Sequence, residues 1–272
     1  MDYGRERDLA LDWMSEAAEI LRPYIGSAQR RTDATRTKAA GDVVTEADHA
    51  ISDMLIRRIA SNFPRDAICS EEGSQHDDPS RRRRWIIDPI DGTRSFIAGK
   101  PGYSVMLALA IEGTPVLGFV YDPVEEETWW AAEGHGVWRD EQRVMRHSRA
   151  PKLFWSPWAP RETGQAIARA LGVEEIIEIE SFGMRAAAMA RDGAGVCASR
   201  PGAPHIWDTA AGWVITREIG ARVTGYDGSP LEFPHHPTMH ADGYVATLGV
   251  DHDRARTLMR EMLPPQREAS QK

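Results

Sequence analysis

Apolar residues recur at helical spacing in two segments near the start of the chain. The first segment spans about residues 6–27, and the second begins at Thr45, with Asp48 placed three residues later as in a capping box. A basic stretch at residues 30–38 separates the two segments and is expected to form a loop. The apolar positions that predict the two helices are Leu9, Trp13, Ala17, Ile20, Leu21 and Ile25, then Ile51, Leu55, Ile56 and Ile59.

Strand patterns dominate the middle of the chain. Two long apolar runs separated by Glu-Gly-Thr-Pro predict a β-hairpin, and a polar stretch at residues 75–84 is expected to be an exposed loop. The strands predicted here cover residues 67–69, the run that ends at 85–88, 103–111, 116–121, 127–132 and 136–139.

After Pro151 the pattern changes to strands that alternate with helices. We therefore predict an N-terminal α+β lobe at residues 1–150 and a C-terminal α/β lobe at residues 151–272, with helices sandwiching sheets. The predicted helices lie at 161–171, 183–191, 208–219 and 254–263, and the predicted strands at 176–179, 196–198 and 244–248.

The composition limits the class of protein. The chain has 272 residues, of which 42% are hydrophobic, and a formal net charge of −8 at pH 7. That charge argues against a nucleic-acid polymer as partner, because such proteins carry a basic face. Cys69 and Cys197 lie far apart in apolar stretches, so both are expected to be buried free thiols in a reducing compartment. A charged N-terminus and no apolar run near the roughly 20 residues of a membrane span predict a soluble, cytoplasmic protein.

The segment from Trp85 to Thr93 carries the strongest chemical signal. Asp88 is expected to end a buried strand, and Asp91 to begin the loop after it. Converging oxygens at a strand end are the ligands that Mg²⁺ selects. Gly92 permits a tight turn, and Thr93 is expected to cap a short helix to about residue 97, whose first N–H groups suit a phosphate. The alternative is an ordinary turn, since these residue types also favour turns.

Four further acidic residues are candidates for the same site. Glu71 follows a short strand, Asp48 lies in the first turn of a predicted helix, Asp42 lies in the loop before it, and Asp208 opens another helix. Each has a structural alternative, because Asp is common at helix N-termini and an acidic pair is common on a surface. Taken singly, none of them establishes a metal site.

Together these segments resemble the inositol monophosphatase-like superfamily. The shared motifs are Gly41–Asp48, Glu71-Glu72, Asp88-Pro89-Ile90-Asp91-Gly92-Thr93 and Trp207-Asp208-Thr209-Ala210-Ala211-Gly212, in the family's order and approximate spacing. The resemblance runs over about residues 8–246. It implies a layered αβαβα fold and a Mg²⁺-dependent, often lithium-sensitive phosphatase that uses two or three ions per site. It also implies a homodimer, which is usual in the family.

The resemblance also assigns roles to individual residues. It implies that metal ions are held by Glu71, Asp88, Asp91, Asp208 and the carbonyl group of Ile90. Asp48 and Thr93 would form a pair that activates water together with Glu71, and the backbone N–H groups of Gly92 and Thr93 would hold the phosphate.

The sequence indicates the phosphate ester that is hydrolysed less clearly than it indicates the metal ligands. Family members that bind inositol carry an acidic residue where this chain has Pro201. Arg185 and Arg200 lie in segments similar to those of bacterial 3'(2'),5'-bisphosphate nucleotidases and are candidates to bind a second phosphate, with a solvated surface charge as the alternative. The leading prediction is hydrolysis of 3'-phosphoadenosine 5'-phosphate. Alternatives are inositol phosphate, histidinol phosphate, which the segment 91–101 resembles more, or a non-catalytic metal-binding scaffold.

The tryptophan residues and a pair of histidines have no assigned role. Core or dimer packing is the expected role of Trp129, Trp130, Trp155 and Trp158, with stacking on an adenine as the alternative for an aromatic pair. His235 and His236 are expected to lie in a loop.

Overall fold

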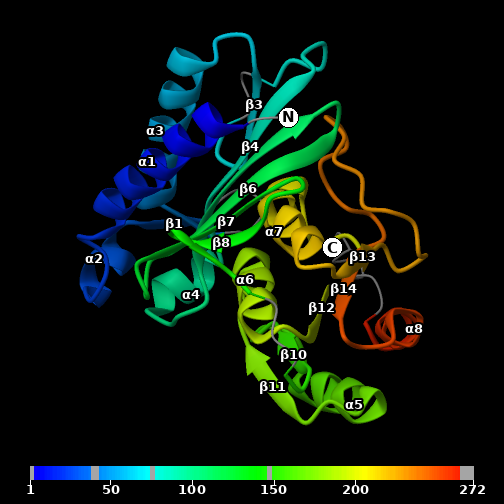
Figure 1. Ribbon diagram of the computed structural model, residues 1–272. Helices are drawn as coiled ribbons and strands as arrows, with labels where there is room; N and C mark the ends of the chain where they lie inside the picture. Colours follow the sequence, from blue (N-terminus) through cyan, green and yellow to red (C-terminus); the bar gives the residue numbers. More distant parts are fainter. Residues whose placement is uncertain (1–2, 38–42, 74–76, 146–148, 264–272) are drawn as a thin grey trace, which may run out of the picture.

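A computed structural model describes residues 3–37, 43–73, 77–145 and 149–263. Two mixed β-sheets alternate with three layers of helices (Figure 1). This is the layered αβαβα arrangement that the family resemblance implies. Within the described ranges, no helix is both long enough and apolar enough to cross a bilayer.

The larger sheet has seven strands in the order β3-β4-β5-β6-β7-β8-β9. β3 is parallel to β4 and every other neighbouring pair is antiparallel. The predicted hairpin is confirmed as β5 and β6. The bounds are β3 Ala67–Ser70, β4 Arg83–Asp91, β5 Ser104–Ile111, β6 Thr114–Asp122, β7 Glu127–Ala132, β8 Gly136–Arg139 and β9 Gln142–Arg143.

The smaller sheet has five strands in the order β11-β10-β12-β14-β13. β10 runs parallel to both of its neighbours, whereas β14 is antiparallel to β12 and β13. A separate two-stranded sheet pairs β1 with β2. The bounds are β10 Lys152–Trp155, β11 Glu175–Glu178, β12 Gly195–Ser199, β13 Arg222–Thr224, β14 Tyr244–Leu248, β1 Thr35–Thr37 and β2 Val43–Thr45.

Helices cover both sheets and fill the space between them. α1 and α3 pack on the outer face of the larger sheet, α6 and α7 lie between the sheets, and α5 and α8 pack outside the smaller sheet (Figure 1). The bounds are α1 Gly4–Leu21, α2 Ala28–Asp33, α3 Glu46–Asn62, α4 Thr93–Ala98, α5 Arg161–Leu171, α6 Phe182–Asp192, α7 Ile206–Glu218 and α8 His252–Met262.

The alternation of side chains along β4 explains why its central residues, Trp85 to Ile87, are all apolar. Trp85 and Ile87 belong to the core under α1 and α3, whereas Ile86 belongs to the core formed with α6 and α7. Successive side chains of a strand point to opposite faces, so a strand covered on both faces needs apolar residues at every position. β4 therefore ends deep inside the molecule, which is where the acidic residues follow.

The structure corrects several predicted boundaries. The first helix ends at Leu21 and not at residue 27, because Pro23 has no N–H group to continue the hydrogen-bonding pattern. The basic segment at 30–38 is not a loop throughout, since it contains the end of α2 and the strand β1. The last predicted helix begins at His252, two residues earlier than expected. Asp42 lies outside the described residues.

Of the remaining predictions on the organisation of the chain, one is confirmed and three are not tested by the structure. The two cysteines are buried free thiols, as predicted. The reducing compartment inferred from them, the division into lobes at residue 150 and the homodimer stay predictions.

Candidate active site

A β-bulge in β4 brings two aspartates together. Asp88 and Asp91 are three residues apart, so in a regular strand their side chains would point to opposite faces. The register of β4 against β5 shifts between Asp88 and Asp91, and Pro89 lies inside this irregular stretch, where a missing N–H is tolerated. Asp91 is the last residue of β4 and not the first of a loop, as the sequence had suggested. The inserted residue lets both carboxylates face one site.

Gly92 and Thr93 form the turn that follows the strand. Gly92 has φ 89°, which favours glycine, and a Cβ there would lie 3.2 Å from the carbonyl oxygen of Gly102. Gly92 is the N-cap of α4, so the prediction that Thr93 caps this helix is wrong: Thr93 is its first residue. The Thr93 hydroxyl donates a hydrogen bond to the Ile90 carbonyl, with 3.0 Å between the oxygens.

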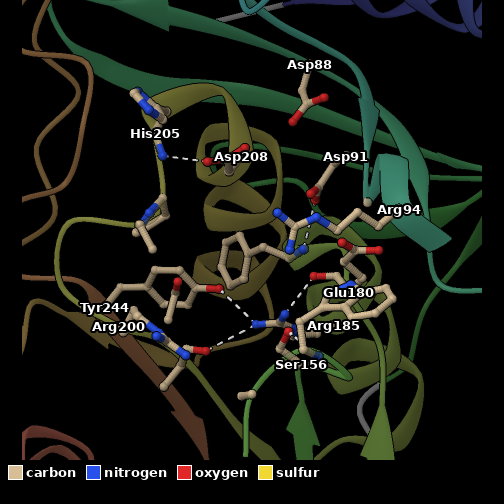
Figure 2. A pocket seen from close by; sticks show the side chains of 18 of the residues that line it. Asp88, Asp91, Arg94, Ser156, Glu180, Arg185, Arg200, His205, Asp208 and Tyr244 are labelled. Carbon is tan, nitrogen blue, oxygen red and sulfur yellow. Dashed lines mark hydrogen bonds between the residues drawn. The ribbon is translucent and has the colours of Figure 1, made fainter. Parts of the chain in front are cut away.

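The third aspartate of the site comes from the start of α7. The helix begins at Ile206, and Asp208 in its first turn accepts a hydrogen bond from the backbone N–H of His205 in a capping box. The N-cap is His205 and Asp208 is the third residue of the helix, so Asp208 takes part in the capping box without being the N-cap that was the alternative interpretation. It nevertheless lies with Asp88 and Asp91, since one carboxylate oxygen from each of the three falls within 4.8 Å of the others. Figure 2 shows the three side chains around the upper part of the cavity.

These carboxylates are held in conditions that disfavour negative charge. Neither oxygen of Asp88 has a hydrogen-bond partner among the described residues. Burial, together with the charges of Glu71, Asp91 and Asp208, raises the pKa of Asp88 well above its ordinary value. Burial raises the pKa of Asp91 to about 7, although hydrogen bonding to Ser181 and the Arg185 charge oppose the rise. Burial and the neighbouring carboxylates also raise the pKa of Asp208.

The chemistry of this donor set fits a hard divalent cation. Three acidic side chains offer oxygen atoms at close range, and the grouping contains no His or Cys. Unsatisfied buried carboxylates are costly unless they are paired or bound to a metal. Oxygen ligands favour Mg²⁺ over Zn²⁺, which prefers nitrogen and sulfur.

Two other predicted residues approach the cluster from α3 and from the end of β3. Glu71 lines the same cavity as the three aspartates. Asp48 is buried, and its Oδ2 accepts hydrogen bonds from the backbone N–H and the hydroxyl of Thr45, which confirms the capping box. Its Oδ1 has no partner in the described part of the chain, and burial raises the pKa of Asp48 to about 7. Asp48 and Thr93 are not hydrogen-bonded to each other, because the Thr93 hydroxyl is used by Ile90.

The two candidate arginines differ in their surroundings. Arg185 is buried and makes four hydrogen bonds, to the carbonyl groups of Ile179, Glu180 and Ala198 and to the Tyr244 hydroxyl. A guanidinium has five N–H donors, so Arg185 retains little capacity for a ligand. Arg200 lines the cavity beyond the aspartates (Figure 2).

The cavity itself has a volume of about 610 Å³ and extends well past the acidic cluster. Its wall includes Arg94 and Glu180, for which the sequence had suggested no role, and Trp158, which was expected to pack in the core or at a dimer contact. The Glu180 carboxylate accepts a hydrogen bond of 2.7 Å from the backbone N–H of Ser95 in α4. No local pattern marks these residues, because they meet only when segments distant in sequence fold together.

Comparisons with known proteins agree with this geometry. The model of the inositol monophosphatase family matches residues 5–263. A histidinol-phosphatase of Mycobacterium tuberculosis is 29% identical over 262 residues, which cover 92% of this chain and 95% of that protein. The 3'(2'),5'-bisphosphate nucleotidase CysQ of Escherichia coli is 31% identical over 219 residues, covering 78% of this chain and 88% of that protein.

A solved structure shows the same fold. An IMPase of Thermotoga maritima matches with a TM-score of 0.78 at 24% identity, over 95% of this chain and 98% of that chain. The family match covers nearly the whole described chain, including the segments that form the acidic cluster. The chain therefore belongs to the inositol monophosphatase family and is a phosphomonoesterase.

Proposed function

We propose that this protein is a Mg²⁺-dependent phosphatase that hydrolyses 3'-phosphoadenosine 5'-phosphate. The observation that carries the metal dependence is the buried Asp88 carboxylate, which receives no hydrogen bond from any described residue and lies beside Asp91 and Asp208. A cation at this position would neutralise charges that burial otherwise penalises.

In this proposal the metal ions are held by Glu71, Asp88, Asp91, Asp208 and the Ile90 carbonyl. Bound Mg²⁺ supplies positive charge that screens a dianionic phosphate and lowers the pKa of water. The Ile90 carbonyl is well placed for this role, because the Thr93 hydroxyl already fixes its orientation.

The residues of the chain then position water and phosphate. Asp48 offers the unpartnered Oδ1 and a pKa of about 7, which suits a group that accepts a proton near neutral pH. The backbone N–H groups of Gly92 and Thr93 at the start of α4 bind phosphate oxygens, and Thr93 activates water together with Asp48 and Glu71. Water attacks phosphorus in line with the departing alcohol.

The nucleotide substrate is supported by the far part of the cavity. Arg200 supplies a positive charge there for a second phosphate, and Pro201 offers no acidic group to bind the hydroxyl of a polyol. The cavity is large enough for a drug-sized ligand. The similarity to CysQ points in the same direction. Arg185 has a weaker claim to contact substrate, because backbone carbonyl groups occupy most of its donors.

Histidinol phosphate is the second candidate. The similarity to the Mycobacterium tuberculosis histidinol-phosphatase spans almost the whole of both chains. The Glu180 carboxylate in the cavity wall would suit the ammonium group of such a substrate.

A panel of phosphate esters tests the proposal. Phosphate release is measured for 3'-phosphoadenosine 5'-phosphate, histidinol phosphate and inositol 1-phosphate at about 5 mM Mg²⁺, the range in which weakly held ions bind, with and without lithium. The expected result is the highest kcat/KM for the nucleotide, and Arg200→Gln is expected to reduce it selectively. A preference for histidinol phosphate that Glu180→Gln abolishes would replace the nucleotide assignment. Activity on none of the esters would contradict the proposal.

A further inference from the structure

Trp158 is unusual among the large apolar side chains. It is 46% exposed, and it is the only aromatic residue among the exposed large hydrophobic residues of the described chain. It lies in the segment between β10 and α5 and lines the candidate active-site cavity. The structure therefore contradicts core packing for this residue, whereas Trp129, Trp130 and Trp155 are buried as expected. An exposed tryptophan on a cavity wall offers a flat apolar surface to a ligand.

Arg94, which lines the same cavity, contacts this ring. Its guanidinium carbon lies 5.9 Å from the centroid of the Trp158 ring, a distance typical of a cation–π contact. Arg94 follows Thr93 directly in α4, so it comes from the turn proposed to bind phosphate. Figure 2 shows its side chain reaching from α4 into the cavity. The contact thus joins the phosphate turn to the segment after β10.

The Arg94 guanidinium has no stronger partner within the described residues. None of the ion pairs or side-chain hydrogen bonds between described residues includes it, in contrast to Arg185, which makes four hydrogen bonds. A cation–π contact at an exposed site is weak, and a planar heterocycle that stacks on the same indole face forms a stronger contact. The guanidinium is therefore easily displaced from the ring and free to approach an anion.

We propose that Trp158 is a specificity-determining residue that stacks on a planar heteroaromatic ring in the leaving group of the substrate, and that this ring displaces Arg94. The displaced guanidinium then moves toward the phosphate bound beside Thr93, where its charge favours the anionic ester. This inference rests on the proposed phosphatase function and adds a criterion for the substrate: adenine, and also imidazole, satisfies it, whereas a saturated polyol such as inositol does not.

Steady-state kinetics test the inference, with and without an aromatic side chain at position 158 and with and without an aromatic ring in the substrate. Trp158→Leu removes the aromatic face, and Trp158→Phe is the matched variant that keeps one. The substrates are 3'-phosphoadenosine 5'-phosphate and glycerol 2-phosphate, which has no ring. Because base stacking is lost, we expect Trp158→Leu to raise KM for the nucleotide about ten-fold. The same variant should change KM for glycerol 2-phosphate by no more than about two-fold. Trp158→Phe should bring KM for the nucleotide most of the way back to the wild-type value. An equal change for both substrates, or none for the nucleotide, would overturn the inference.

A binding measurement separates this inference from the proposed function. Calorimetric titration of the full-length protein with adenosine 5'-phosphate and ribose 5-phosphate, both at saturating Mg²⁺, does not require turnover. We expect adenosine 5'-phosphate to bind more tightly to the wild-type protein and Trp158→Leu to remove that difference. If wild-type protein releases no phosphate from any ester yet shows this ring-dependent binding, the proposed function fails and the stacking site stands. If it is active but the two ligands bind equally, the stacking site fails alone.

Discussion

The close approach of α7 to the larger sheet provides a sharp test of how Asp208 is positioned. Gly118 in β6 lies directly under this helix, and a Cβ at Gly118 would lie 2.6 Å from the Ala211 carbonyl oxygen and 3.0 Å from its Cα. An ordinary contact begins at 3.4 Å, so Gly118→Ala requires α7 to recede by about 0.8 Å at this point. Asp208 lies three residues before Ala211 on the same helix. The displacement therefore reaches the acidic cluster.

The expected cost has two parts. Overpacking a dense core costs about 1–3 kcal/mol of stability, which for a chain of this size lowers Tm by roughly 2–10 °C. Misplacing a reacting group by about 1 Å can cost about 100-fold in rate, so we expect kcat to fall about 10- to 100-fold. The Mg²⁺ concentration that gives half-maximal activity should rise as well, because Asp208 moves relative to Asp88.

The matched control is Gly195→Ala in β12. A Cβ there would lie 2.5 Å from a ring carbon of Phe154, so it overpacks the core without pressing on α7. We expect a similar loss of Tm, measured by differential scanning fluorimetry, with kcat per folded molecule within about two-fold of wild type. The reasoning is refuted if Gly118→Ala lowers Tm yet keeps wild-type kcat, or if both variants lose activity in proportion to stability.

Three further predictions follow from buried polar groups. In excess EDTA, Asp88→Asn should stabilise the protein by about 1–3 kcal/mol and so raise Tm, because it removes a buried carboxyl that must either take up a proton or carry a charge with no donor among the described residues. Phosphate release should fall below a hundredth of wild type, and a lower Tm would contradict this prediction. Arg185→Met should lower stability by about 3 kcal/mol, since it leaves buried carbonyl groups unpaired; an unchanged Tm with a raised KM would instead support a substrate contact. Burial holds the pKa of His252 at about 4, below its ordinary 6.5, so its neutral ring contributes stability that is fully present above pH 6.5 and is lost as pH falls through 4. His252→Gln should therefore show a smaller drop in Tm between pH 7 and pH 4.5 than wild type, and an equal drop would refute this.

Local patterns predicted much of the fold because they depend on neighbouring residues. The capping box of Thr45 and Asp48 is an interaction within one helical turn, and the structure confirms it. The β5–β6 hairpin was equally accessible, since a short turn determines its pairing. In contrast, β10 and β13 were not predicted. They are short, and they become strands because residues far along the chain provide their hydrogen-bonding partners.

The acidic cluster was predicted from motifs, but its geometry was not. The sequence suggested that Asp88 and Asp91 lie near each other, yet only the register of β4 against β5 reveals the bulge that turns both toward one site. The surroundings of the arginines were also inaccessible. In the sequence, Arg185 and Arg200 are simply two arginines. Only the fold shows that Arg185 is buried and bonded to carbonyl groups, whereas Arg200 faces the cavity.

The wall of the cavity was the least predictable part. Arg94 and Trp158 are separated by many residues and meet across the site, so no periodicity or spacing links them. Trp158 was expected to pack in the core or at a dimer contact like the other tryptophans, because burial is the common outcome for such a side chain. The exposure of Trp158 in a cavity depends on the tertiary structure, and it is the basis for the proposed contact with the leaving group of the substrate.

The most direct test of the central claim is the rate of phosphate release from 3'-phosphoadenosine 5'-phosphate as a function of Mg²⁺ concentration. The claim is that Asp88, Asp91 and Asp208 hold the cation that hydrolysis requires. We predict no release in excess EDTA, a saturable rise to a plateau at about 5 mM Mg²⁺, and a loss of this response in Asp91→Asn, which should retain the wild-type fold. Undiminished release in EDTA, or an Asp91→Asn variant with more than about a tenth of wild-type activity, would contradict the account.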